Sequence, residues 1–367
     1  MWIICQECQG QGKINRGLSK KAQRIYKTDL AEYERTKSTD SPPAKPKAHL
    51  HLCSTCSGSG LIQSDHFTPI NTDFPNVAII GAGIGGVALA VACLHRGIPF
   101  TIYERDSDFD ARSQGYGLTL QQASKAMKGL GITSLDGVIS TKHVVHNTEG
   151  KVLGEWGTRK WLETEIPTPI KRTNIHIARQ SLRLALLEQL GEKAINWGYQ
   201  LIDFQESENE VELNFLVDGE LKTSKADLVV GADGIRSVVR RLTIGEHTTP
   251  LRYLDCIVIL GICPLSSLEG ISSPLLDSAT VFQTANGNER IYIMPYAADS
   301  VMWQLSFPIS EEEAKELSAK GPQALKEEAC RRTQWHAPIP QILEATQENL
   351  ISGYPVYDRE LLNAEVL

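Results

Sequence analysis

The sequence predicts an α/β protein with a Rossmann-like dinucleotide-binding domain, a substrate domain built on a mixed or antiparallel sheet, and a small cysteine-rich N-terminal arm. Three observations lead to this prediction. A glycine-rich turn follows an apolar run at 77–80, a Gly-Ala-Asp-Gly sequence follows a second apolar run at 228–230, and two matching C-x-x-C motifs lie near the N-terminus. From residue 76 onward, strand-like and helix-like segments alternate, as they do in α/β domains.

The composition excludes several classes of protein. The chain has 367 residues, enough for two or three domains, and its 41% hydrophobic and 22% charged residues are an ordinary globular composition. A net charge of −7 argues against affinity for nucleic acid or anionic membranes. We expect no membrane-spanning helix, because no run of about 18 apolar residues occurs. The N-terminus carries no secretory signal, so the expected compartment is the cytoplasm.

The chain divides into three parts by composition. We expect a cysteine-rich arm at 1–63, a linker with two prolines at 64–75, and the dinucleotide-binding and substrate region at 76–367. Within the last part, the two functions are expected to interleave: dinucleotide-binding parts at about 76–133 and 171–245, and the substrate sheet at about 134–170 and 246–357.

The arm contains an internal repeat, apolar-C-x-x-C-x-G-x-G, which places Cys5 and Cys8 in one copy and Cys53 and Cys56 in the other. A structural zinc ion needs four thiolates at about 2.3 Å. The glycines let backbone amides turn toward the sulfurs. The pattern therefore predicts one zinc ion on four cysteines. The alternative, a pair of redox-active dithiols, is less favoured because no βαβ domain surrounds the motifs.

The repeats resemble the cysteine-rich zinc region of DnaJ-type co-chaperones. Two motifs rather than four imply one zinc ion, and the resemblance does not imply chaperone activity. Basic residues dominate the segment between the motifs, where 19–35 is expected to be helical. We interpret the charge as a solvated helix face rather than a nucleic-acid patch, because aromatic side chains do not alternate with it. A protein partner for the arm stays an open alternative.

The glycine-rich turn meets the requirements of a dinucleotide site. In G-x-G-x-x-G, Gly81 permits the tight turn, Gly83 lets the backbone approach a pyrophosphate, and Gly86 lets helix and strand pack closely. A helix N-terminus then offers amide donors to the phosphates. Glu104 closes the next predicted strand about 20 residues further on, where it can accept ribose hydroxyls. An acid here favours an unphosphorylated ribose, hence FAD or NAD.

The rest of the chain turns this prediction toward FAD. Asp227 to Ser237 reads as a strand, a Gly-Ala-Asp-Gly turn and a helix start, which resembles the D-G motif of class A flavoprotein monooxygenases, the aromatic hydroxylases related to p-hydroxybenzoate hydroxylase. The Glu-Arg pair at 104–105, the segment 178–183 and the loop at 114–118 match that family too. The resemblance implies an FAD site formed by these residues: Gly81, Gly83, Gly86, Glu104, Arg105, Arg112, Gln114, Gly117, Arg179 and Asp233.

One family motif is missing. The family carries a Gly-Asp motif after the last substrate-domain strand, and no Gly-Asp dipeptide occurs in this sequence. The chain ends at Leu367, about where that motif would begin. We therefore expect a chain that is incomplete at its C-terminus, or a shortened homologue.

The resemblance implies hydroxylation of an electron-rich aromatic or polyketide-like small molecule, with FAD, NAD(P)H and dioxygen. Strands are expected around Cys256 to Ile262 and Val301 to Phe307. Between them, residues 279–284 and 290–295 are expected to form a hairpin around an Asn-Gly turn. Side chains expected to face the substrate pocket are Gln283, Tyr292, Met294, Tyr296 and Trp303. Two alternatives stay open: a flavin-dependent reductase or dehydrogenase on the same fold, and a non-catalytic interaction protein that carries flavin and zinc.

Overall fold

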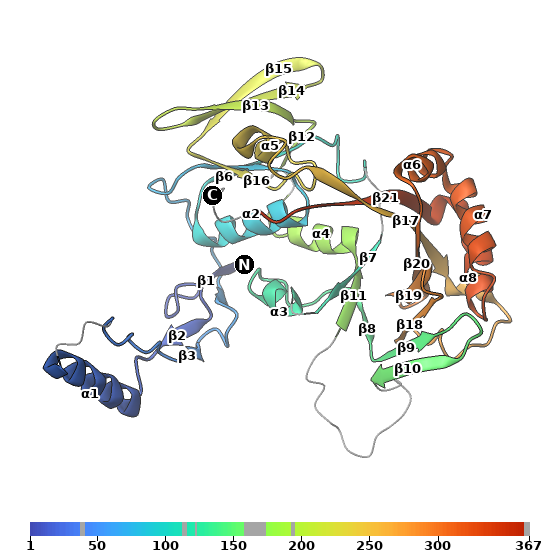
Figure 1. Cartoon of the computed structure of the whole chain (residues 1–367). Helices are drawn as coiled ribbons and strands as arrows, with labels where there is room; N and C mark the ends of the chain where they lie inside the picture. Colours follow the sequence, from blue (N-terminus) through green and yellow to red (C-terminus); the bar gives the residue numbers. More distant parts are fainter. Residues whose placement is uncertain (37–40, 112–115, 122, 158–173, 192–194, 363–367) are drawn as a thin grey trace.

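The computed structural model describes residues 1–36, 41–111, 116–121, 123–157, 174–191 and 195–362. Among these residues, no helix is both long enough and apolar enough to cross a membrane. Figure 1 shows the N-terminal end of the chain beside α2 and α3, and a separate layer of strands and helices formed by the C-terminal part.

The arm consists of two short antiparallel strand pairs and one helix. β1 pairs with β4 and β2 pairs with β3, so that the two cysteine motifs are brought together from the ends of the segment. The helix α1 projects from the arm (Figure 1) and has no buried residue. The bounds are β1 Trp2–Ile4, β2 Lys13–Asn15, α1 Lys20–Thr36, β3 Leu50–Leu52 and β4 Leu61–Gln63.

A parallel sheet in the order β12-β6-β5-β16 forms the dinucleotide-binding domain. β5 is buried along its whole length, as expected of a central parallel strand. α2 crosses from β5 to β6 and ends at Gly97, whose φ of +66° forms the left-handed C-cap. The bounds are β5 Val77–Ile80, α2 Ile84–Arg96, β6 Phe100–Glu104, α3 Ala123–Lys128, α4 Arg179–Leu187, β12 Ile195–Trp197, β16 Leu228–Gly231 and α5 Val238–Ile244.

Two antiparallel three-stranded sheets flank the parallel sheet. One has the order β7-β11-β8, and the other has the order β13-β14-β15. β8 lies in the segment that we expected in the substrate sheet, but it pairs with β11 next to the dinucleotide-binding domain. The bounds are β7 Gly117–Leu120, β8 Val138–Ser140, β11 Asn174–Ala178, β13 Gln200–Glu206, β14 Val211–Val217 and β15 Glu220–Ala226.

A mixed seven-stranded sheet, β10-β9-β18-β19-β20-β17-β21, forms the second layer. β9 and β18 are parallel, and the other neighbours are antiparallel. The predicted hairpin is confirmed, because β18 pairs with β19 across the Asn-Gly turn. The bounds are β9 Lys142–His146, β10 Val152–Gly157, β17 Leu251–Pro264, β18 Thr280–Ala285, β19 Arg290–Ala297, β20 Ser300–Pro308 and β21 Ile351–Arg359.

The two faces of this sheet have different neighbours. One face forms the largest apolar core with the C-terminal helices, and the other packs on β7, β8 and β11. The helices and turns on the first face are η1 Leu265–Leu268, α6 Glu311–Ala319, α7 Pro322–Arg332, α8 Ile339–Ala345 and η2 Glu348–Leu350. α6 begins at a capping box formed by Ser310 and Glu313.

Candidate functional site

A cleft of about 290 Å³ opens at the carboxyl ends of β5, β6 and β16, against the N-terminus of α2. This edge of an open parallel sheet is where such folds bind ligands. Six of the residues predicted from the sequence line it: Gly81, Gly83, Glu104, Arg105, Arg179 and Asp233. Two others, Arg112 and Gln114, lie outside the described residues.

The three glycines of the turn have different surroundings. Gly81 has a φ of +104°, and a Cβ there would lie 2.6 Å from the carbonyl oxygen of Ala232, so the two glycine-containing motifs touch. A Cβ on Gly86 would lie 1.9 Å from the carbonyl oxygen of Gly81. Gly83 has no atom within 4 Å of its Cβ position, so the space in front of it is free for a ligand.

Glu104 is fixed by backbone amides. One carboxylate oxygen accepts the N–H of Ala82 at 2.7 Å, and the other accepts the N–H of Asp106 at 3.1 Å. Only 9% of Glu104 is exposed, and what is exposed faces the cleft. Each oxygen keeps a lone pair that a ribose hydroxyl could use.

Asp233 presents an unpaired oxygen. Its Oδ2 accepts the N–H groups of Val238 and Val239 at 2.7 and 3.2 Å, at the start of α5. Its Oδ1 is buried and finds no hydrogen-bond partner among the described residues. A buried carboxylate oxygen without a donor is costly, and a ligand hydroxyl in the cleft would remove that cost.

Four arginines line the cleft (Arg105, Arg179, Arg183 and Arg236) against three acids (Glu104, Asp106 and Asp233), which leaves one formal positive charge. The sequence analysis did not single out Arg183. Its Nε donates to the carbonyl oxygen of Ala82 at 2.8 Å, and its guanidinium lies over the rings of Phe109 and Trp197. The resulting positive charge beside the uncapped N-terminus of α2 suits an anionic ligand such as a diphosphate.

Tyr116 connects the cleft to the seven-stranded sheet. Its hydroxyl accepts a hydrogen bond from Arg179 at 2.6 Å, and its ring packs against an apolar face that contains Met294 and Met302. The next residue, Gly117, does not line the cleft, and its N–H points to the sulfur of Met302 at 2.9 Å. A Cβ on Gly117 would lie 2.2 Å from Met294 Cε, the flexible end of that side chain, so the two layers pack closely at this glycine.

The side chains expected to face the substrate do not all lie on the same face of the seven-stranded sheet. Tyr292, Met294 and Tyr296 belong to the apolar face next to Tyr116. The expectation for Trp303 is wrong, because this side chain is fully buried in the opposite core, where its Nε1 donates to Thr346 at 2.9 Å. Gln283 accepts a hydrogen bond from Arg290 at 2.9 Å.

One histidine lies fully buried behind the apolar face. His176 on β11 hydrogen-bonds Thr119 through Nδ1 at 3.0 Å and Ser140 through Nε2 at 2.7 Å. Burial lowers the pKa of His176 to about 4, because it disfavours the charged ring. The imidazole is therefore neutral at physiological pH, and its two hydrogen bonds join β11 to the strands on either side.

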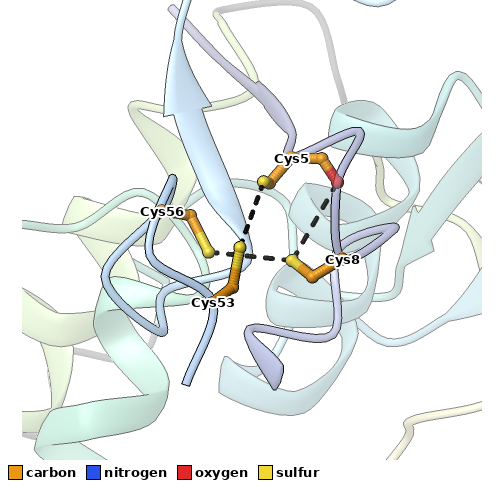
Figure 2. Close-up of side chains that lie close together, drawn as sticks. All are labelled: Cys5, Cys8, Cys53 and Cys56. Atoms are coloured by element: carbon orange, nitrogen blue, oxygen red, sulfur yellow. Dashed lines mark hydrogen bonds between the residues drawn. The ribbon is translucent and has the colours of Figure 1, made fainter. Parts of the chain in front are cut away.

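The four cysteines of the arm form a second candidate site (Figure 2). All four side chains are buried, and their sulfurs lie within 4.8 Å of one another. The Cys5–Cys53 and Cys8–Cys56 sulfur distances are 3.8 and 3.7 Å. A tetrahedral zinc ion with Zn–S bonds of about 2.3 Å holds its sulfurs about 3.8 Å apart, whereas a disulfide bond measures about 2.0 Å.

The backbone around these sulfurs repeats from one motif to the other. The N–H of Gly12 points to Cys8 Sγ and the N–H of Gly60 to Cys56 Sγ, both at 3.2 Å. The thiol pKa values of the cluster shift in both directions. Burial raises the pKa of Cys56, but the N–H groups of Gly60 and Gly58 outweigh it and the pKa falls to about 7. Burial raises the pKa of Cys8. The N–H of Cys56 lowers the pKa of Cys53, but burial and the neighbouring sulfurs outweigh it and the pKa rises to about 12. N–H donors that stabilise thiolate are what a metal site of this kind requires.

Comparison with known proteins agrees with this geometry. Residues 75–349 match the family described as FAD binding domain, which is most of the chain. The chain is 28% identical to aurachin C monooxygenase/isomerase of Stigmatella aurantiaca over 287 residues, covering 77% of this chain and 69% of that protein. It is 22% identical to 6-hydroxynicotinate 3-monooxygenase of Pseudomonas fluorescens, covering 78% and 72%.

Solved structures share the fold. HpxO of Klebsiella pneumoniae, complexed with FAD and uric acid, superposes with a TM-score of 0.63 at 19% identity, covering 78% of this chain and 68% of that chain. The 2,6-dihydroxypyridine-3-hydroxylase of Arthrobacter nicotinovorans gives a TM-score of 0.65 at 16% identity, covering 80% and 74%. The chain belongs to the FAD-binding domain family. It is an FAD-dependent oxidoreductase of the monooxygenase class.

Proposed function

We propose that this enzyme hydroxylates an electron-rich aromatic or polyketide-like small molecule, with NAD(P)H as reductant and dioxygen as oxidant. The observation that carries the proposal is the position of Tyr116, which lines the cleft and also packs on the apolar face of the seven-stranded sheet. That face carries the half-buried Tyr292 and Tyr296 beside the buried Met294 and Met302, side chains that suit a flat apolar ring. The name of the relative that acts on 6-hydroxynicotinate supports an aromatic substrate.

The residues of the cleft fit FAD. The amides at the start of α2 and Arg105 would hold the diphosphate, and Glu104 would accept the ribose hydroxyls. The unpaired Oδ1 of Asp233 would accept a further hydroxyl, and Arg179 would lie against the flavin ring. When bound, FAD supplies the redox chemistry, by taking a hydride from NAD(P)H and activating dioxygen.

The protein's own part is to position the substrate and exclude water. The apolar face also carries the buried Val258, Leu260 and Val281, so a substrate held against it would be shielded from solvent. A reaction of this kind requires no nucleophilic triad, because the cofactor provides the reactive oxygen. The buried His176 is neutral and already engaged by two hydroxyls, so it serves the packing of β11.

The proposal is tested with the full chain reconstituted with FAD. A panel of phenolic and hydroxypyridine compounds should stimulate oxidation of NAD(P)H, and oxygen from isotopically labelled dioxygen should enter the product. The test variant is Glu104→Gln, which should lose activity at low FAD and regain it as FAD is raised. If oxidation of NAD(P)H requires an added electron acceptor and its rate does not depend on dioxygen, the protein is a flavin reductase or dehydrogenase instead.

We further propose that the arm binds one zinc ion through Cys5, Cys8, Cys53 and Cys56. The sulfur spacing and the N–H donors described above support this assignment. Freshly purified, reduced protein should contain one equivalent of zinc and release it when the thiols are chemically modified. Protein free of metal under those conditions would contradict the assignment.

A further inference from the structure

The N-terminal arm packs directly on the FAD-binding domain. β1 lies beside α2 (Figure 1), and the ring of Trp2 lies on the turn that follows α3. A Cβ on Gly131 in that turn would be only 2.5 Å from Trp2 Cδ1, and a Cβ on Gly129 would be 3.4 Å from the carbonyl oxygen of Ser59. Both cysteine motifs therefore contribute to the contact, one through the strand before it and the other through its glycine-rich turn.

A second set of contacts joins the arm to the C-terminal end of α2. The guanidinium of Arg96, the last residue of α2, lies 3.1 Å from the Cβ position of Gly10 in the first cysteine motif. The segment expected to be a linker also packs there, because Thr68 donates its hydroxyl to the carbonyl oxygen of His95 at 2.9 Å. The N–H of Asn71 donates to the carbonyl oxygen of Gly97 at 2.8 Å.

The elements under the arm lead to the FAD cleft. α2 ends beneath the arm and begins at the cleft, where its first turn follows Gly83. The turn at 129–131 is flanked by Met127 and Ile132, which insert into the same apolar core as Val87 and Val91 of α2. A rigid helix and a shared core are the physical means by which contacts at one end affect a site at the other.

The arm has little besides its cysteines to hold it in shape. Its buried cluster consists of the four cysteines, with Ile14 and Ile62 partly buried against them. An assembly this small is expected to fold only when a metal ion joins the thiolates. The contacts of Trp2 and Ser59 with the turn at 129–131 should therefore depend on the metal.

We propose that zinc turns the arm into a clasp that holds α2 and the turn at 129–131, so that metal occupancy sets how tightly the protein retains FAD. This inference rests on the proposed FAD and zinc sites. The coupling is reciprocal: any free energy by which zinc strengthens FAD binding is the free energy by which FAD strengthens zinc binding.

The test measures zinc content and the FAD dissociation constant of the full chain in the wild type and four variants. Cys53→Ser should lose the metal and bind FAD more weakly by about 5-fold or more, the low end for coupled sites. Trp2→Ala keeps the four ligands, so it should retain zinc and weaken FAD binding by a similar factor. The double variant should bind FAD no more weakly than Cys53→Ser does, because both changes remove the same contact between the arm and the turn at 129–131. Cys330→Ser, on the remote helix α7, is the matched control and should leave both quantities unchanged.

Amide hydrogen exchange makes the result independent of the FAD assignment. Zinc removal should raise amide exchange in α2 and in residues 129–132, even in protein that takes up no flavin. Failure to take up flavin would reject the FAD proposal, whereas the raised exchange would still support the contact between the arm and these segments. If Cys53→Ser loses zinc while FAD affinity and exchange in these segments stay at the wild-type values, the clasp is refuted. Absence of zinc from the wild-type protein would refute it as well.

Discussion

The glycine turn provides a prediction with two separable parts. Gly86→Ala places a Cβ 1.9 Å from the carbonyl oxygen of Gly81, and this neighbour is backbone that cannot rotate away. Reaching an ordinary contact of 3.4 Å requires the start of α2 to move by about 1.5 Å. Overpacking of this kind costs about 1–3 kcal/mol. The variant should therefore unfold at a lower temperature and also bind FAD more weakly, since the amides of α2 are displaced.

Gly83→Ala separates binding from stability. Its Cβ meets no atom within 4 Å and its φ of −69° suits any residue, so thermal unfolding of the flavin-free protein should not change. The methyl group occupies the space through which a pyrophosphate approaches, so FAD affinity should fall by about 10-fold or more. Gly85→Ala, also free of neighbours and outside the cleft, is the control and should affect neither quantity.

The assays are thermal unfolding followed by circular dichroism and titration of FAD followed by fluorescence. The reasoning fails if Gly86→Ala melts at the wild-type temperature, or if Gly83→Ala binds FAD as tightly as the wild type.

Three further predictions concern other parts of the site. Glu104→Ala leaves two backbone N–H groups unpaired and should cost about 1–3 kcal/mol of stability beside its loss of FAD affinity, as denaturant unfolding would show. Trp303→Ala should cost about 3–5 kcal/mol of stability with no change in substrate preference. Tyr296→Ala should change the substrate preference and cost less stability, because Tyr296 is only half-buried. Equal effects on substrate preference would contradict the assignment of strand faces. Because the pKa of His176 is lowered to about 4 from 6.5, the unfolded chain binds more protons below pH 6.5, so the free energy of unfolding should fall as pH drops from 6.5 towards 4. His95, whose pKa burial also lowers to about 4, adds to the same dependence, so His176→Gln should reduce it without abolishing it. An unchanged pH profile would show that other groups are responsible.

Local pattern was enough to bring the glycine turn and Glu104 to one cleft. The turn at 81–86 and Glu104 are joined by one strand, one helix and the next strand, so their geometry follows from a single βαβ unit. The pairing of the two cysteine motifs was predicted for a similar reason, since a metal site needs all four ligands in one place.

Features that depend on packing between distant segments could not be predicted from the sequence. Trp303 was expected near the substrate, but the face of a strand depends on register, and one residue of difference reverses every side chain. Arg183 was not singled out, because its role depends on Phe109 and Trp197, which approach it from other elements. The packing of Trp2 on Gly131 carries no sequence signal, since a glycine in a turn has many explanations.

The most direct test of the account is a crystal structure of the full chain grown with FAD. The account predicts the diphosphate at the first turn of α2, the ribose hydroxyls of the adenosine half within hydrogen-bond distance of the Glu104 carboxylate, and a donor from the cofactor on Oδ1 of Asp233. FAD bound elsewhere, or a cleft that stays closed to FAD with Glu104 turned away, would contradict it.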